Sequence, residues 1–143
     1  MGACLCLPGN ASVEDLKYLG VTYKPKRQWR VPRSIIEGIL RVESNSYLTS
    51  DDEVVWVNRS RGAHGERGPT QLRRIALVDI ARPNDYYRIE HEMEVAIDAT
   101  ETYLLKLYRQ LGSWNKAIAA YNTGASRWNT EAGSIYRKRV WNR

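Results

Sequence analysis

One carboxylate stands at a position where an apolar side chain is expected. Within residues 35–47, IIEGILRVESNSY, an apolar stripe at helical spacing is formed by Ile36, Ile39 and Leu40, and the next position on that stripe is Glu43. Burial disfavours the ionised form of a carboxyl group and raises its pKa, which suits a general acid that works near neutral pH. Glu43 is therefore the candidate catalytic residue, and the alternative is a helix end at which it points to water.

The element that must position Glu43 is a helix introduced by Pro32. After the sequence HGERGP, a second helix is predicted over residues 70–82, and Pro83 sets its predicted end. Between these two helices, residues 53–58, EVVWVN, alternate weakly, and the turn sequence RSRG follows them. This pattern predicts a small β-hairpin.

The longest predicted helix covers residues 89–111. Its apolar residues recur at alternating steps of four and three, and Gly112 closes it. Ser113 can cap a shorter helix that Gly124 ends, and a last helix contains SIYRKRVW at residues 134–141. The predicted fold class is therefore mainly α, with at most one small hairpin.

The chain has the length of one compact domain. We predict that this domain covers residues 32–143. Residues 1–31 are punctuated by Gly and Pro and hold one short helical candidate at residues 13–19, so we expect an appendage that packs on the domain.

Four short motifs follow one another in the chain: ES at residues 43–44, GPTQ at residues 68–71, AYNTG at residues 120–124, and Tyr136. This order resembles the lytic transglycosylases of the lysozyme-like superfamily, which are related to goose-type lysozyme. Their pattern has a catalytic glutamate followed by serine, a Gly-Leu-Met-Gln turn, Ala-Tyr-Asn-Ala-Gly and a late tyrosine. The resemblance covers roughly residues 32–140 and implies a lysozyme-like helical domain of the SLT and goose type that degrades peptidoglycan.

The resemblance also implies a substrate site around Glu43, which would be the sole acid/base. The residues implied to bind substrate are Ser44, Gly68, Gln71, Tyr121, Asn122 and Tyr136. Ser44 would orient Glu43 or the substrate, and Tyr136 would form a hydrogen bond near Glu43. Gly68 would let the backbone of its turn approach an N-acetyl group, since glycine has no side chain in the way.

The chain departs from the family pattern in the second motif. Pro69 and Thr70 replace the Leu-Met pair, which alters the floor of the expected groove, and the stretch between the first two motifs is longer than in typical members. Structural alternatives also stay open in the third motif. Tyr121 lies on an apolar helix face and can be a core residue, and Asn122 can be a helix C-cap.

Two reactions fit the resemblance. In a lytic transglycosylase, Glu43 protonates the oxygen between N-acetylmuramic acid and N-acetylglucosamine and then, as a base, helps the muramyl 6-hydroxyl group close a 1,6-anhydro ring. A hydrolase commonly needs a second carboxylate, for which Asp51, Asp52 and Glu66 are candidates unless they are solvated loop charges. The alternative of another class is a non-catalytic glycan-binding module.

The net charge of +6 and the pI near 9.5 favour polyanionic partners, and peptidoglycan glycan strands are the expected one. No nucleic acid is expected, since neither a basic stripe along one helix nor a binding module is present. No stretch approaches membrane-spanning length, so no membrane insertion is expected. We also expect a monomer. Nine Tyr, five Trp and no Phe permit a carbohydrate groove or an amphipathic core.

No cofactor or metal is expected, because His64 and His91 are too few and lack ligand spacing. Cys4 and Cys6 are assigned no chemistry, because a disulfide between residues two apart would be strained. No secretory signal is visible. Action on the cell wall, in the periplasm or outside the cell, therefore suggests a phage lysis or virion-associated enzyme, or a domain of a larger secreted protein.

Overall fold

A computed structural model describes residues 21–25, 28–56 and 61–142 of the chain. In chain order its elements are β1 Val21–Tyr23, α2 Arg33–Ser44, β2 Tyr47–Leu48, β3 Val54–Trp56, α3 Arg74–Asp79, the 3-10 helix η1 Pro83–Tyr86, α4 Met93–Leu111, α5 Trp114–Thr123, the 3-10 helix η2 Ala125–Arg127 and α6 Glu131–Trp141. The prediction of a mainly helical fold is confirmed. The helix predicted at residues 13–19 lies outside the described residues, as do Cys4 and Cys6.

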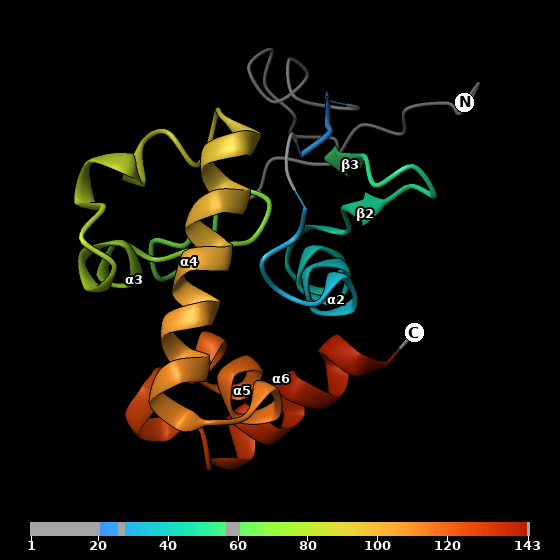
Figure 1. The fold of residues 1–143 in the computed structure, drawn as a ribbon. Helices are drawn as coiled ribbons and strands as arrows, with labels where there is room; N and C mark the ends of the chain where they lie inside the picture. Colours follow the sequence, from blue (N-terminus) through green and yellow to red (C-terminus); the bar gives the residue numbers. More distant parts are fainter. Residues whose placement is uncertain (1–20, 26–27, 57–60, 143) are drawn as a thin grey trace.

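Helix α4 is the longest element and spans the molecule, with α5 and α6 across one of its ends and α3 beside it (Figure 1). It begins at Met93 rather than at the predicted Ile89, which lies in the preceding turn and is fully buried. The predicted C-terminal ends of α4 and α5 and the predicted cap of α5 are confirmed. Gly112 closes α4 in a left-handed conformation, and the hydroxyl of Ser113 accepts a hydrogen bond from the Lys116 amide at the start of α5.

Helix α2 lies in the core with the face that the sequence predicts. Four of its apolar side chains are fully buried, namely Ile35, Ile36, Ile39 and Leu40. The helix begins after Pro32 and ends at Asn45, which adopts a left-handed conformation with φ of 56°. Glu43 therefore sits in the last turn of a helix whose position is fixed by core packing.

Helix α6 packs closely against α2. A Cβ atom added at Gly38 would lie 2.3 Å from the carbonyl oxygen of Val140, so the absence of a side chain at Gly38 permits the two helices to approach. Nearby, the guanidinium group of Arg41 donates to the carbonyl oxygens of Val140 at 2.8 Å and of Asn142 at 2.6 Å. These bonds satisfy carbonyl groups that the end of α6 leaves without helical partners.

A three-stranded antiparallel sheet covers one side of α2, with strand order β1-β3-β2. The predicted strand is confirmed as β3, whose Val54 and Trp56 are fully buried. The hairpin that the structure describes joins β3 to the strand before it, and the chain reverses within residues 49–53, where the Thr49 amide donates to the Glu53 carbonyl oxygen. The sequence RSRG lies partly outside the described residues.

The helix predicted over residues 70–82 is much shorter, since α3 covers only Arg74–Asp79. Before it, the backbone amide and carbonyl groups of Arg67 and Leu72 bond to each other and close a tight loop. Gln71 in this loop has φ of 55°, which is incompatible with a helix. After α3, Pro83 begins the 3-10 helix η1 instead of only ending a helix.

None of the helices in the described part of the chain combines the length and the apolar character that crossing a bilayer requires.

Candidate active site

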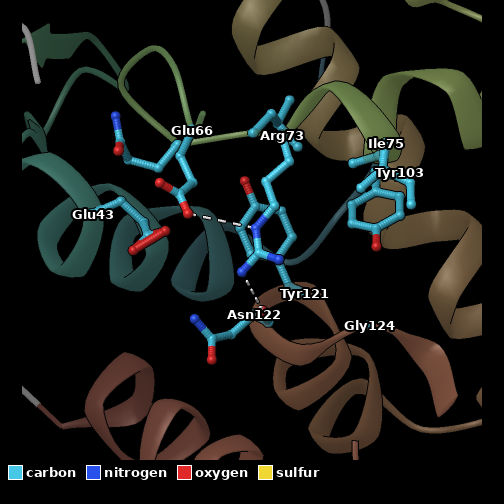
Figure 2. A pocket seen from close by; sticks show the side chains of 11 residues that line it. Glu43, Glu66, Arg73, Ile75, Tyr103, Tyr121, Asn122 and Gly124 are labelled. Carbon is cyan, nitrogen blue, oxygen red and sulfur yellow. Dashed lines mark hydrogen bonds and ion pairs between the residues drawn. The ribbon is translucent and has the colours of Figure 1, made fainter. Parts of the chain in front are cut away.

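A pocket opens where the last turn of α2 faces the end of α5 and the start of α3 (Figure 2). Its lining comes from α2 (Glu43), from the loop before α3 (Glu66, Gln71, Leu72, Arg73), from α3 (Ile75, Ala76), from α4 (Tyr103) and from the end of α5 (Tyr121, Asn122, Gly124). Three of the four motifs found in the sequence thus contribute side chains to one pocket. Carboxylates, a guanidinium group and tyrosines form a mixed polar and aromatic lining.

Glu43 lines this pocket from a partly buried position. Burial, which penalises the charged form, raises the pKa of Glu43 to about 7. The positive charges of Arg139 and Arg73 lower this pKa, and the negative charge of Glu66 raises it. Glu43 can therefore hold a proton, and also lose it, close to neutral pH.

Ser44 follows Glu43 but is not among the described residues that line the pocket. Its hydroxyl group is buried and donates to the carbonyl oxygen of Pro69 at 2.7 Å, and the hydroxyl of Ser46 lies 2.7 Å away. These contacts connect the end of α2 to the GPTQ turn. Ser44 thus fixes the position of the turn relative to Glu43.

The GPTQ turn presents Gln71 to the pocket and buries Gly68. Gly68 has φ of 82°, and a Cβ atom added there would lie 2.4 Å from the carbonyl oxygen of Ile89. The requirement for glycine therefore comes from contact with the chain before α4. The amide nitrogen of the Gln71 side chain donates back to the Gly68 carbonyl oxygen at 2.9 Å, which holds its side chain within the turn.

Two tyrosines that the resemblance places in the site lie against each other. The rings of Tyr121 and Tyr136 are stacked with centroids 6.3 Å apart. The Tyr121 hydroxyl donates to the Thr70 carbonyl oxygen at 2.6 Å, so Tyr121 is both part of the pocket lining and part of the core.

Tyr136 is buried, and no described residue accepts or donates a hydrogen bond at its hydroxyl group. Burial raises the pKa of Tyr136, and the negative charge of Glu43 raises it further. The phenol therefore stays protonated and lies within electrostatic reach of Glu43.

The pocket contains a second carboxylate, Glu66. Its Oε2 atom accepts from the backbone amide of His64 at 3.2 Å, and Oε1 lies 3.5 Å from Nε of Arg73. A terminal nitrogen of Arg73 also donates to the carbonyl oxygen of Asn122 at 3.3 Å. Arg73 thus extends between Glu66 on one side and the end of α5 on the other (Figure 2).

Asp51 and Asp52, the other two sequence candidates for a second carboxylate, do not line the pocket as the described residues define it. Asp52 pairs with Arg33 at the start of α2, and Asp51 is exposed in the turn between β2 and β3. Only Glu66 of the three lies with Glu43.

Three further residues that line the pocket were not predicted from the sequence: Arg73, Ile75 and Tyr103. Arg73 lies two residues after the GPTQ motif, which was a usable signal, whereas Tyr103 is one of many tyrosines and Ile75 resembles any helix residue. No tryptophan lines the described pocket. No three His, Cys, Asp or Glu side chains in the described ranges come together as a metal site would require.

Comparisons with known proteins identify the family to which the chain belongs. Neither a curated protein sequence nor a solved structure matches the chain significantly. The family model of the transglycosylase SLT domain matches residues 21–143, a stretch that begins with β1 and contains every described helix. Because this match covers most of the chain, the protein belongs to the family of transglycosylase SLT domains, which are lysozyme-like and act on peptidoglycan in the cell wall.

Proposed function

We propose that the protein is a lytic transglycosylase that cleaves the β-1,4 bond between N-acetylmuramic acid and N-acetylglucosamine, with Glu43 as its acid/base. The observation that carries this proposal is the environment of Glu43, which borders the pocket and has a pKa raised to about 7 by burial. A carboxyl group with this pKa can donate a proton and take it back near neutral pH. Membership of the family supports the choice of substrate.

In the first step, the protonated carboxyl group of Glu43 gives its proton to the glycosidic oxygen. The bond from that oxygen to C1 of the muramyl residue breaks, and the N-acetylglucosamine residue leaves with a free 4-hydroxyl group. The acetamido oxygen of the substrate stabilises the positive charge that develops at C1. Glu43 is left as a carboxylate.

In the second step, the Glu43 carboxylate removes the proton from the muramyl 6-hydroxyl group while the oxygen of that group bonds to C1. The 1,6-anhydro ring closes, and Glu43 has regained the proton that it gave away. No water is consumed, so one carboxylate is sufficient.

The other residues act in this reaction by binding or by positioning. Gln71, Tyr121 and Asn122 line the pocket and bind the sugar residues next to the scissile bond. Ser44 and Gly68 are positioning residues, because their contacts with Pro69 and Ile89 support the turn that carries Gln71.

Tyr136 supports Glu43 in this proposal. Its hydroxyl group is buried, has no hydrogen-bond partner among the described residues and is acted on by the charge of Glu43. It can donate to the Glu43 carboxylate when that carboxylate forms in the first step.

A hydrolase that uses Glu66 is the second candidate. The observation that favours it is the presence of Glu66 in the pocket together with its effect on the pKa of Glu43. A second carboxylate can activate water or attack C1, and either route gives a reducing end instead of an anhydro ring. The salt bridge to Arg73 counts against Glu66 as a nucleophile, since the guanidinium group stabilises the negative charge of the carboxylate and so makes it less reactive.

Mass spectrometry of the muropeptides released from purified peptidoglycan tests these proposals. The wild type is expected to release 1,6-anhydromuramyl ends, and Glu43→Gln to lose about 100-fold to 10,000-fold in rate. Reducing ends that disappear in Glu66→Gln would establish the hydrolase. No release by the wild type would favour a non-catalytic glycan-binding module.

Glu37→Gln is the matched control. Glu37 lies on the same helix as Glu43 and bonds to Arg33 at 2.8 Å on a partly exposed face away from the pocket. This variant should keep the wild-type rate.

The predicted boundary after residue 31 stays a prediction, which limited proteolysis followed by a rate measurement on the resulting fragment can test.

A further inference from the structure

Arg73 is the one cation in the described lining of the pocket, and its side chain extends from the start of α3 into the space beside Glu43 (Figure 2). Its side chain is 45% exposed, so it can be reached from solvent. Glu43 and Arg73 line the same pocket, so the guanidinium group and the carboxyl group border one common space. A substrate bound next to Glu43 will therefore meet this guanidinium group.

The protein holds the Arg73 side chain only loosely. Its separation from Glu66 is 3.5 Å, which is too long for a good hydrogen bond, and its bond to the Asn122 carbonyl oxygen is 3.3 Å. A guanidinium group has five N–H donors in a planar fork. Most of these donors are thus left for a ligand.

Glu66 does not depend on Arg73 for its position. Its Oε2 atom is bonded to the His64 amide, and its side chain occupies the space beside Gly62, where an added Cβ atom would meet Oε2 at 1.6 Å. Arg73 can therefore turn from Glu66 toward a ligand while Glu66 stays in place. The exchange replaces one carboxylate partner of Arg73 by another.

Peptidoglycan carries carboxylates close to the bond that is cleaved. The muramyl residue has a lactyl ether at O3, whose carboxyl group is free when no peptide is attached and is an amide when a stem peptide is present. The stem peptide has carboxylates of its own. A planar guanidinium fork matches a carboxylate with two parallel hydrogen bonds, and it gains much less from an uncharged amide.

We propose that Arg73 binds a carboxylate of the glycan substrate and so makes the enzyme prefer strands that carry one beside the scissile bond. The inference rests on the proposed cleavage of peptidoglycan and adds a specificity-determining residue to it. The carboxylate comes from the lactyl group of a peptide-free muramyl residue or from the stem peptide, and the test separates these two sources.

The test compares matched substrates that differ only in one charge. One pair consists of peptide-free N-acetylglucosamine–N-acetylmuramic acid oligosaccharides with free lactyl carboxylates or with the same groups converted to primary amides. A second pair consists of strands whose stem-peptide carboxylates are free or amidated. The readout is the ratio of kcat/KM for the acid substrate to kcat/KM for the amide substrate.

We expect Arg73→Gln to lower this ratio about 10-fold to 100-fold in at least one pair, because bonds from a charged donor to a carboxylate are lost. A loss in the first pair identifies the lactyl carboxylate, and a loss in the second identifies the peptide. An unchanged ratio in both pairs would overturn the proposal. A ratio is used because loss of Arg73 also alters the pKa of Glu43 and changes both rates together.

Arg74→Gln is the matched control. Arg74 is the next residue, but it is not part of the described pocket lining, and its guanidinium group lies over the ring of Tyr86 at 4.5 Å from the centroid. The ratio of kcat/KM for the acid substrate to kcat/KM for the amide substrate should be the same in Arg74→Gln as in the wild type. If Arg73→Gln does not fold, Arg73→Lys decides, because lysine keeps the charge without the planar fork; an unchanged ratio in that variant would also count against the proposal.

Failure of this inference can be told from failure of the proposed function. If the wild type cleaves none of the four substrates, the proposed function is wrong, and calorimetric binding of the acid and amide oligosaccharides then tests Arg73 alone. If the wild type cleaves them and the ratio does not depend on Arg73, the function stands and the inference is wrong.

Discussion

Glu66 and Glu43 line the same pocket, and the negative charge of Glu66 raises the pKa of Glu43. The two carboxylates come from different elements, Glu43 from the last turn of α2 and Glu66 from the loop before α3. Arg73 lies beside Glu66 and acts on Glu43 in the opposite direction. Burial and three neighbouring charges together decide at which pH Glu43 holds its proton.

The proposed function predicts that activity falls as pH rises through about 7, because Glu43 must be protonated to act first as an acid. The pH dependence of kcat/KM measures this limb in the free enzyme. Glu66→Gln should move the limb to lower pH, since a charge that favours the protonated form is removed. Arg139→Gln should move it to higher pH, since a charge that favours the carboxylate is removed.

These two variants control for each other, because a general loss of activity lowers the whole profile without moving its limb. Shifts in the same direction for both variants would contradict the electrostatic account. A wild-type limb near the ordinary glutamate pKa would contradict the raised pKa itself.

The raised pKa of Glu43 also predicts a loss of stability at high pH. Between the ordinary value of 4.5 and about 7, the folded protein keeps a proton on Glu43 that the unfolded chain has released. The stabilisation is fully present below 4.5 and is lost as pH rises through 7, on the order of 3 kcal/mol in total. Glu43→Gln should lack this loss and should be more stable than the wild type at pH 8.

Urea unfolding of the wild type and of Glu43→Gln at pH 4.5 and pH 8 measures the difference. Glu37→Gln, on the same helix, should follow the wild type. An equal pH dependence of stability in Glu43→Gln and the wild type would show that folding does not raise the pKa of Glu43.

Gly68→Ala should be strongly destabilising. An alanine there must adopt φ of 82°, which costs roughly 1–2 kcal/mol, and its Cβ atom would also meet the carbonyl oxygen of Ile89 at 2.4 Å. The contact adds about 1–3 kcal/mol. Gly112→Ala is the control, because Gly112 has φ of 76° but no atom within 4 Å of an added Cβ. Denaturant unfolding should separate the two variants; equal losses would remove the contact with Ile89 from the explanation.

Tyr136→Phe and Tyr121→Phe should have opposite effects on stability. Tyr136→Phe removes a buried hydroxyl group that has no hydrogen-bond partner among the described residues, so the folded state should keep its stability or gain about 1 kcal/mol. Tyr121→Phe leaves the Thr70 carbonyl oxygen without its donor and should cost about 1–3 kcal/mol. Thermal unfolding measures both.

Activity should rank the same two variants differently. Under the proposed mechanism, Tyr136→Phe should lower kcat although it is stable, because it removes the hydroxyl group that donates to the Glu43 carboxylate as that carboxylate forms. Full activity in stable Tyr136→Phe would limit Tyr136 to a packing role.

The sequence predicted the elements that local signals define. Helices α4 and α5 could be found because apolar residues repeat along them and because Gly112, Ser113 and Gly124 mark their ends. Strand β1 could not, because Val21–Tyr23 is short and is defined by pairing with residues that lie more than 30 positions later. The early part of the predicted helix over residues 70–82 failed because Thr70 bonds to Thr100 of α4, a tertiary contact that overrides local preference.

The same limit applies to the site. Glu43 could be singled out because it interrupts an apolar stripe, a signal contained within one helix. Glu66 could only be named together with Asp51 and Asp52, because the fold of the loop decides which of the three carboxylates lies near Glu43. The salt bridge from Arg33 holds Asp52 at the other end of α2, and no pattern in the loop itself indicates that bond.

The close contact between α2 and α6 joins Glu43 to the helix that carries two groups interacting with it. Gly38 lets the two helices touch, and Arg41 bonds to the end of α6, so Glu43 on α2 is held against the helix that carries Tyr136 and Arg139. The loop before α3 is tied to α2 as well, because the Ser44 hydroxyl group donates to the Pro69 carbonyl oxygen. Both walls of the pocket are thus anchored on α2, so the spacing between Glu43 and the loop that carries Glu66 and Arg73 is set by one helix.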